Sequence, residues 1–211
     1  MKFLAFAIFS CSDCKTFYFA GQETSNTLLV WTVFLLAVHT DWQEEARKEI
    51  LQLFGKQNPN PDGISKLKIM SMILDESLRL YPPAVAIPRS TGREVRLGKL
   101  IVLANGDLLV SVLALHHDPQ FWGPDVHLFK PERFSRGVAK ATISNVGAFV
   151  PFGLGPRTCV GLNFAITEAK IALSMILQCY SFTLSLAYIH SPYQNITLRP
   201  QHGLQVLLQP L

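Results

Sequence analysis

The chain has 211 residues, of which 49% are hydrophobic, and a formal net charge of +4. This length allows one domain with a sizeable core, and the absence of a Lys/Arg block argues against nucleic-acid binding. The mean hydropathy of +0.25 is high for a soluble protein, which indicates a core-rich part of something larger or a location near a membrane. Residues 28–38 are strongly apolar but too few to span a bilayer, so they favour a buried core helix.

Helical periodicity dominates the N-terminal part of the chain. Residues 13–39 are predicted to form one long helix and residues 42–54 a second, amphipathic one that ends at Gly55. A loop rich in Pro, Asn and Gly then leads to a third helix over residues 65–80, which Pro82 and Pro83 end.

Strand patterns and irregular segments follow. Short strands are predicted at residues 94–97, 100–102 and 108–110, with Asn105-Gly106 as a turn. Residues 118–151 have little periodicity, and a loop of that length is usually functional or packed on something. A last long helix is predicted over residues 162–179, and a β-hairpin within residues 182–208. The fold class is therefore mainly α with small β-sheets.

The most informative segment surrounds Cys159, which follows a turn rich in Gly and Pro and precedes an apolar helical run. A thiolate is a strong, soft metal ligand that backbone N–H groups and a helix N-terminus stabilise. Gly155 and Gly161 permit turns and close approach of the backbone to a flat group, and Arg157 is placed to meet an anion. Together they suggest haem, with Cys159 as the axial iron ligand. The alternative for a lone Cys is a small buried hydrophobe.

This segment resembles the haem-binding signature of the cytochrome P-450 family, Phe-x-x-Gly-x-Arg-x-Cys-x-Gly. All five specified positions match, beginning at Phe152 and ending at Gly161. The resemblance implies the C-terminal half of that fold for residues 13–211: a long central helix, a Glu-x-x-Arg helix, a meander loop, the Cys-ligand loop with the final helix, and a terminal β-hairpin. Residues 1–12 are an atypical N-terminal segment with a weak signal-peptide pattern, and Met1 is expected not to be the natural start.

A second motif, Ala20-Gly21-Gln22-Glu23-Thr24-Ser25, lies within the first predicted helix. Gly inside a helix costs about 1 kcal/mol relative to Ala, so a loosened turn that holds a ligand or water beside the alcohol is expected. The motif resembles the oxygen-activation motif of the family. There, Thr24 would hydrogen-bond the bound dioxygen and Glu23 would help deliver protons. The alternative is a solvated Glu and Thr on a helix surface.

A third pattern is Glu76-Ser77-Leu78-Arg79, in which Glu and Arg share one face of a helix. By itself it predicts an ordinary exposed ion pair of little energetic value. The family has such a pair before a proline pair, and its partner Arg follows in a downstream loop. The resemblance therefore implies a structural network of Glu76, Arg79 and Arg133 that fixes the loop leading into the Cys ligand.

A fourth position is Arg89, which would pair with a haem propionate as Arg157 would, by resemblance to the family. The alternative is a surface Arg beside a strand. The same resemblance implies that residues on two segments line the substrate pocket: Ala20, Gly21, Ala84, Val85, Ala86 and Ile87. The adjacent His116 and His117 invite a metal site, but the family has a similar segment without a metal ligand, and none is predicted.

The resemblance implies a haem-thiolate monooxygenase that inserts one oxygen atom from dioxygen into a hydrophobic small molecule. Its cofactor would be haem b (iron protoporphyrin IX), and NADPH would supply electrons only through a partner reductase. Nucleic acid is not an expected partner. Full-length members are membrane-anchored on the cytosolic face of the endoplasmic reticulum. The residue pattern is most similar to the plant clan that acts on terpenoids, hormones and fatty acids.

Three alternatives stay open at this point. The chain is less than half of the family's usual length, so it could be a truncated, inactive fragment or a non-catalytic interaction protein. Relatives that rearrange peroxides as isomerases or dehydratases need neither dioxygen nor reductase, although they often lack the acid–alcohol pair. A thiol-redox role for Cys11 and Cys14 is the most distant, because no second pair completes a zinc site and the sparse cysteines fit a reducing compartment.

Overall fold

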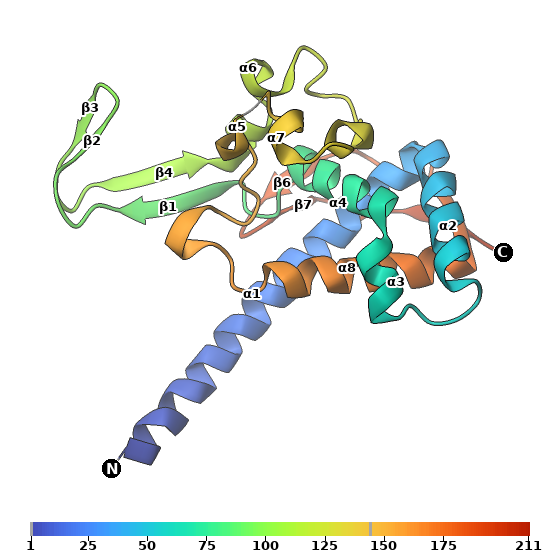
Figure 1. The fold of residues 1–211 in the computed structure, drawn as a ribbon, viewed down its shortest axis with the longest axis horizontal. Helices are drawn as coiled ribbons and strands as arrows, with labels where there is room; N and C mark the ends of the chain where they lie inside the picture. Colours follow the sequence, from blue (N-terminus) through green and yellow to red (C-terminus); the bar gives the residue numbers. More distant parts are fainter. Residues whose placement is uncertain (1, 144) are drawn as a thin grey trace.

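The structure is a computed structural model that describes the backbone of residues 2–143 and 145–211, and the side chains of residues 13–143 and 145–211. Helices and short two-stranded sheets make up the fold (Figure 1), which confirms the predicted class. The helices are α1 (Lys2–Val38), α2 (Thr40–Phe54), α3 (Pro61–Lys66), α4 (Lys68–Leu80), α5 (Val112–His116), α6 (Pro119–Trp122), α7 (Val138–Ala141) and α8 (Leu162–Cys179). The strands are β1 (Ala86–Ser90), β2 (Val95–Leu97), β3 (Leu100–Val102), β4 (Asp107–Ser111), β5 (Tyr180–Leu184), β6 (Pro192–Gln194), β7 (Leu198–Pro200) and β8 (Val206–Pro210).

The main core lies where α1, α2, α4 and α8 pack together with β5. Leu36, Ile50, Leu74 and Leu173 each come from a different one of these helices, and none of them is exposed. Among the described residues, α8 is the one helix long and apolar enough to cross a membrane. Only 22% of α8 is buried, and its contacts within the chain are mainly with α2 and α1.

The helix predicted over residues 65–80 is wrong in one respect, because it is divided at Leu67. The Leu67 backbone is extended, with φ −67° and ψ 93°, and it separates α3 from α4. The first N–H groups of α4 are satisfied from another helix: the Glu49 carboxylate of α2 accepts hydrogen bonds from Lys68, Ile69 and Met70 at 2.7–3.0 Å. A long-range cap of this kind leaves no local pattern in the sequence.

The sheets are antiparallel and pair in nested hairpins. Strand β1 pairs with β4, from Ala86 opposite Ser111 to Ser90 opposite Asp107, and encloses the β2–β3 hairpin. This ribbon projects from the helical body (Figure 1). Strand β1 was not predicted because Pro88 interrupts its pattern. The predicted turn is confirmed, with Asn105 at φ 60°.

The C-terminal hairpin has two parts. Strands β5 and β8 pair at its base, and β6 and β7 pair toward its tip. Residues 118–151 are irregular as predicted, with short helical turns that include 3-10 helices at Pro131–Phe134 and Val146–Ala148. They enclose a small core around Trp122 and Phe134.

Candidate functional site

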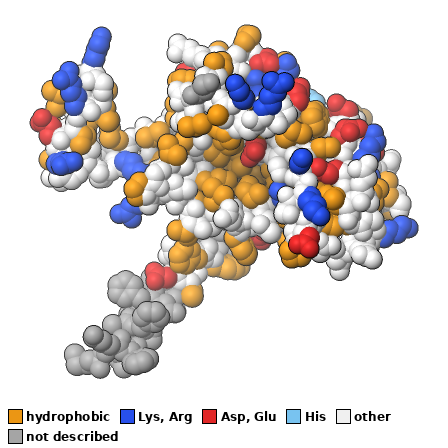
Figure 2. Space-filling view, viewed as in Figure 1, with side chains coloured by type: hydrophobic (Ala, Val, Ile, Leu, Met, Phe, Trp, Pro, Cys, Tyr) orange, Lys and Arg blue, Asp and Glu red, His pale blue; other side chains and the backbone are white. Residues whose placement is uncertain are grey.

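An apolar cavity of about 620 Å³ lies where α1, the segment after α4, the loop before α8 and the start of α8 meet. Figure 2 shows apolar side chains gathered at the centre of the face that it presents. Cys159 lines the cavity together with Arg89 and Arg157. The lining from α1 consists of Thr16, Phe17, Ala20, Gly21, Thr24, Ser25 and Leu28.

The backbone before α8 folds into a tight loop that places Cys159 at the cavity. Gly153 and Gly155 have φ of +75° and +81°, a region that side chains other than hydrogen disfavour. The Cys159 N–H donates to the Phe152 carbonyl at 2.9 Å, which closes the loop. The Cys159 thiol is free and exposed.

Gly161 has no left-handed backbone, and a Cβ at this position would make only an ordinary van der Waals contact. Its φ is −89°, and a Cβ added there would lie 3.8 Å from Cys159 Sγ. Hydrophobic surface surrounds the thiol: Val160 is 84% exposed and Phe164 is 74% exposed, and both line the cavity. A flat apolar group seated beside Cys159 would cover this surface.

Two guanidinium groups reach the cavity from separate elements. Arg89 lies on β1, and among the described residues its side chain donates only to the neighbouring Pro88 carbonyl, at 2.8 Å. Arg157 ends the 3-10 turn Gly155–Arg157, and its side chain has no hydrogen bond or ion pair within the described part of the chain. Both are therefore available to bind acid groups of a ligand. Sequence reasoning selected both residues.

The oxygen-activation motif splits between the cavity and another surface. Ala20, Gly21 and Thr24 line the cavity, whereas Glu23 does not. The expected loosened turn is wrong, because α1 continues through the motif without a break. The Thr24 hydroxyl donates to the Ala20 carbonyl at 2.7 Å, and such i−4 bonding is how a Thr is accommodated within a helix.

The segment after α4 contributes to the cavity at two of its four expected positions. Ala84 and Ile87 line the cavity. Val85 is buried against Trp31 and Leu198, with Ala86 packed beside it, outside the cavity lining. Two of the four residues expected here as pocket lining therefore support the wall from behind.

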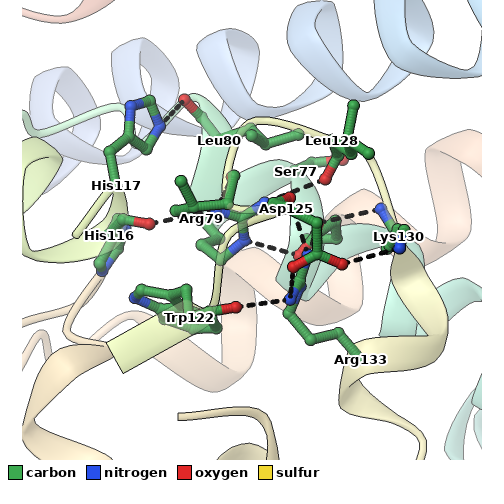
Figure 3. Close-up of polar contacts among 12 residues, drawn as sticks. Ser77, Arg79, Leu80, His116, His117, Trp122, Asp125, Leu128, Lys130 and Arg133 are labelled. Atoms are coloured by element: carbon green, nitrogen blue, oxygen red, sulfur yellow. Dashed lines mark hydrogen bonds and ion pairs between the residues drawn. The ribbon is translucent and has the colours of Figure 1, made fainter. Parts of the chain in front are cut away.

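Behind the cavity lies a buried ionic network (Figure 3). The Glu76 and Arg79 side chains are 0% exposed and form a bidentate pair at 2.7 and 2.8 Å. The other Arg79 donors bind the carbonyls of His116, Val126 and Leu128. All five N–H donors of Arg79 are thus used, as a buried guanidinium requires.

Arg133 joins this network through an ion pair with Glu76, with Nε 3.7 Å from Oε1. Its stronger contacts are with Asp125, at 3.1 Å, and with the Trp122 carbonyl, at 2.9 Å. A hydrogen bond from Lys130 and the one from Arg133 lower the pKa of Asp125 to about 2. Asp125 was missed by sequence reasoning, because an isolated Asp in a loop has no distinguishing pattern.

His116 connects the network to the Cys159 loop. Its carbonyl binds Arg79, and its Nε2 accepts from the Val150 N–H at 3.0 Å. Burial lowers the pKa of His116 to about 3, so the ring is neutral and keeps the lone pair that Val150 needs. In the described residues, no group of three or more His, Cys, Asp or Glu side chains could hold a metal ion.

These features fit a haem. The cavity offers a thiol as an axial ligand, apolar walls for a flat ring and two guanidinium groups for its acid substituents. The positive φ of Gly153 and Gly155 shapes the loop that presents the thiol.

Comparison with known proteins agrees with this geometry. The sequence model of the cytochrome P450 family matches residues 12–208. Cytochrome P450 CYP749A22 of Panax ginseng is 65% identical over 199 residues, which cover 94% of this chain and 38% of the relative. The 7-deoxyloganic acid hydroxylase of Catharanthus roseus and the 11-oxo-beta-amyrin 30-oxidase of Glycyrrhiza uralensis are each 51% identical with the same coverage. The chain thus spans well under half the length of these plant relatives, and it belongs to the cytochrome P450 family.

Proposed function

We propose that this chain forms the haem-binding part of a monooxygenase that acts on a hydrophobic small molecule. The observation that carries the proposal is the meeting of Cys159 with Arg89 and Arg157 at one apolar cavity. A thiolate-ligated haem, when bound, supplies the activation of dioxygen that this chemistry requires.

The chain's own residues have distinct tasks in this proposal. Cys159 provides the thiolate, and the Gly153–Gly155 turn presents it at the cavity. Arg89 and Arg157 bind the two acid groups of the haem. The Thr24 hydroxyl, one of the polar groups on the α1 wall, orients a small molecule in the cavity.

The substrate class follows from apolarity and from the relatives. Ala20, Ala84 and Ile87 form a wall without charge, which favours a hydrophobic substrate over an ionic one. Two relatives are named for acting on 7-deoxyloganic acid and on 11-oxo-beta-amyrin. We propose a terpenoid substrate, electrons from NADPH through a reductase, and attachment of the whole protein to the cytosolic face of the endoplasmic reticulum.

The test is the reduced carbon monoxide difference spectrum of the full-length protein. The Cys159→Ala variant is expected to lose the thiolate-type band, and the Cys179→Ala variant, at the far end of α8, is expected to keep it. A Cys159→Ala variant that retained the band would overturn the assignment. Oxygen uptake that depends on NADPH and reductase, with 11-oxo-beta-amyrin as a probe, separates a monooxygenase from a peroxide-rearranging relative.

A further inference from the structure

A cluster of aromatic rings fills the space where the middle of α1, the end of α4 and the loop between β5 and β6 meet. The Trp31 ring lies flat on the Tyr81 ring, with centroids 4.1 Å apart and planes 9° apart. The Phe34 ring stacks on the His190 ring, with centroids 5.0 Å apart, and contacts the Tyr188 ring at 5.4 Å. Trp31 is 0% exposed, whereas His190 is exposed. The aromatic cluster therefore runs from the interior to the surface.

Both nitrogens of the His190 ring contact phenol hydroxyls. Nε2 lies 3.3 Å from the Tyr81 hydroxyl, and Nδ1 lies 3.1 Å from the Tyr188 hydroxyl. A neutral imidazole has one donor and one acceptor, an imidazolium has two donors, and a phenol oxygen can donate or accept. Both hydrogen bonds can therefore form whether His190 is neutral or protonated. The ring can take a proton from Tyr81 at Nε2 without moving.

The charge states of the two groups suit such a transfer. Burial raises the pKa of Tyr81 to about 12, so its phenol keeps the proton at neutral pH. Burial also lowers the pKa of His190, so its ring is neutral and one nitrogen is free to accept. A phenol that loses an electron becomes strongly acidic, and its proton then needs a base already in contact. His190 is that base.

The buried end of the aromatic cluster lies directly behind the cavity wall. Trp31 packs against Val85, which supports that wall from behind, and Leu28, one helical turn before Trp31, lines the cavity. The Trp31 ring N–H donates to the Leu198 carbonyl at 2.6 Å, which fixes the indole against Tyr81. Indole and phenol are the aromatic side chains that lose an electron most readily. Rings of the right chemistry thus connect the cavity wall with the surface.

We propose that Trp31, Tyr81 and His190 form a path that carries oxidising equivalents away from the cavity when a peroxide is activated there without substrate. One electron passes from Tyr81 through Trp31 to the peroxide-derived oxidant, which is thereby reduced by one electron. The Tyr81 O–H bond breaks and an N–H bond forms at His190 Nε2, which leaves a neutral tyrosyl radical and an imidazolium. A small reductant such as ascorbate returns the electron, and the proton moves back from Nε2. This inference rests on the proposed function, because the oxidant forms only where haem is bound.

The first test detects the radical rather than turnover. The full-length, haem-loaded protein is mixed with hydrogen peroxide without substrate, frozen, and studied by electron paramagnetic resonance. The wild type is expected to show a tyrosyl signal that narrows with ring-deuterated tyrosine. Tyr81→Phe keeps the stacked ring, removes only the hydroxyl, and is expected to lose this signal. Tyr193→Phe, on an exposed Tyr of β6, is the matched control and is expected to keep it. No tyrosyl signal in the wild type, or an unchanged signal in Tyr81→Phe, would overturn the proposal.

The second test asks whether His190 accepts the proton. His190→Gln keeps a group that can hydrogen-bond Tyr81 but removes the basic nitrogen, and it is expected to lower the yield of the tyrosyl signal. Tyr188→Phe leaves Nε2 in place and is expected to retain the yield. In the wild type, radical formation is expected to be slower in D₂O, because the O–H bond breaks in the same step. Equal yields and equal isotope effects in His190→Gln and the wild type would show that the ring only packs.

The third test measures the protection that the path gives. Bleaching of the haem absorbance by hydrogen peroxide is followed without substrate, with and without ascorbate. Ascorbate is expected to slow bleaching in the wild type, because it refills the path at its exposed end. In Tyr81→Phe, bleaching is expected to be faster and ascorbate to have little effect. Equal protection by ascorbate in both proteins would contradict the path.

The two proposals fail in different ways. If the wild-type protein shows no thiolate-type carbon monoxide band, the proposed function fails. Oxidation of the full-length protein by a ruthenium photo-oxidant then still reports whether Tyr81 passes its proton to His190. If the band is present in the wild type and in Tyr81→Phe, and the tyrosyl signal does not depend on Tyr81, only the electron path is lost.

Discussion

The two walls of the cavity are built differently. Behind the Cys159 wall lies a network in which Glu76 and Arg79 are wholly buried and fully hydrogen-bonded. The opposite wall, on α1, begins in a stretch where residues 13–22 are all exposed, and Phe17 is 63% exposed although it lines the cavity. One wall is held by buried charge, and the other by the contacts that α1 makes from Glu23 onward.

Of the two walls, the Cys159 wall is the one whose position this part of the chain fixes through its own buried contacts. Buried charges are costly unless paired, so the Glu76–Arg79 pair tolerates little displacement of its partners. Those partners include the His116 carbonyl, and His116 in turn binds Val150 at the start of the Cys159 loop. The position of the thiol is therefore set by groups far from the cavity surface.

The largest expected effect on stability comes from the substitution Arg79→Leu in the network behind the Cys159 wall. It leaves the Glu76 carboxylate buried without its bidentate partner, which is expected to cost about 3–5 kcal/mol of unfolding free energy. Chemical denaturation followed by circular dichroism measures the loss. The matched control is Lys48→Met, which removes the exposed pair with Glu45 and is expected to change the unfolding free energy far less than Arg79→Leu does, because water screens an exposed pair. Similar losses in both variants would contradict the contrast between buried and exposed pairs.

Protonation of His116 is expected to make the free energy of unfolding depend on pH. Because burial lowers its pKa to about 3 in the folded state, the unfolded state binds the proton more readily between about pH 3 and 6.5. Its contribution to stability is therefore fully present above about pH 6.5 and is lost as the pH falls toward 3. Comparing unfolding of wild type and His116→Gln from pH 4 to 7.5 checks this. Parallel pH profiles would show that His116 titrates normally.

The roles of the Arg89 and Arg157 guanidinium groups in haem binding can be tested one at a time. Arg157→Gln is expected to weaken haem binding more than tenfold, because a charge-assisted contact contributes about 1.5–3 kcal/mol. Arg89→Gln is expected to have a similar or smaller effect, since Arg89 also binds the Pro88 carbonyl. Haem titration of the full-length apoprotein measures both affinities. The control Arg136→Gln removes an exposed Arg that is not part of the cavity lining and is expected to leave affinity unchanged.

The smallest expected effect concerns Asp75 of α4. Burial raises its pKa to about 6, although Lys170 of α8 opposes the shift. A raised folded-state pKa means that its contribution is present below about pH 4 and is lost as the pH rises through 6. Asp75→Asn is therefore expected to flatten the decline in stability between about pH 4 and 6. A thermal unfolding series over this range is sufficient, and an unchanged slope would contradict the shift.

Structural features that depend only on neighbouring residues could be predicted from the sequence alone. The bounds of α8, the irregular segment over residues 118–151 and the turn at Asn105 follow from local periodicity and from the chemistry of Pro, Gly and Asn. The Cys159 loop was recognised because its Gly, Arg and Cys lie within one short run, where backbone geometry and ligand chemistry constrain each other. The family followed from the order of such runs.

Contacts between residues that are far apart in the sequence became visible only in the tertiary structure. Glu23 meets Arg199 across 176 positions, and Glu49 caps α4 from another helix. Asp125 and His116 hold Arg133 and Val150 in the same way. The physical reason is that hydrogen bonds and ion pairs depend on distance in space, which packing of the apolar core sets. A single sequence shows the groups able to form such contacts, whereas the folded core selects which of them meet.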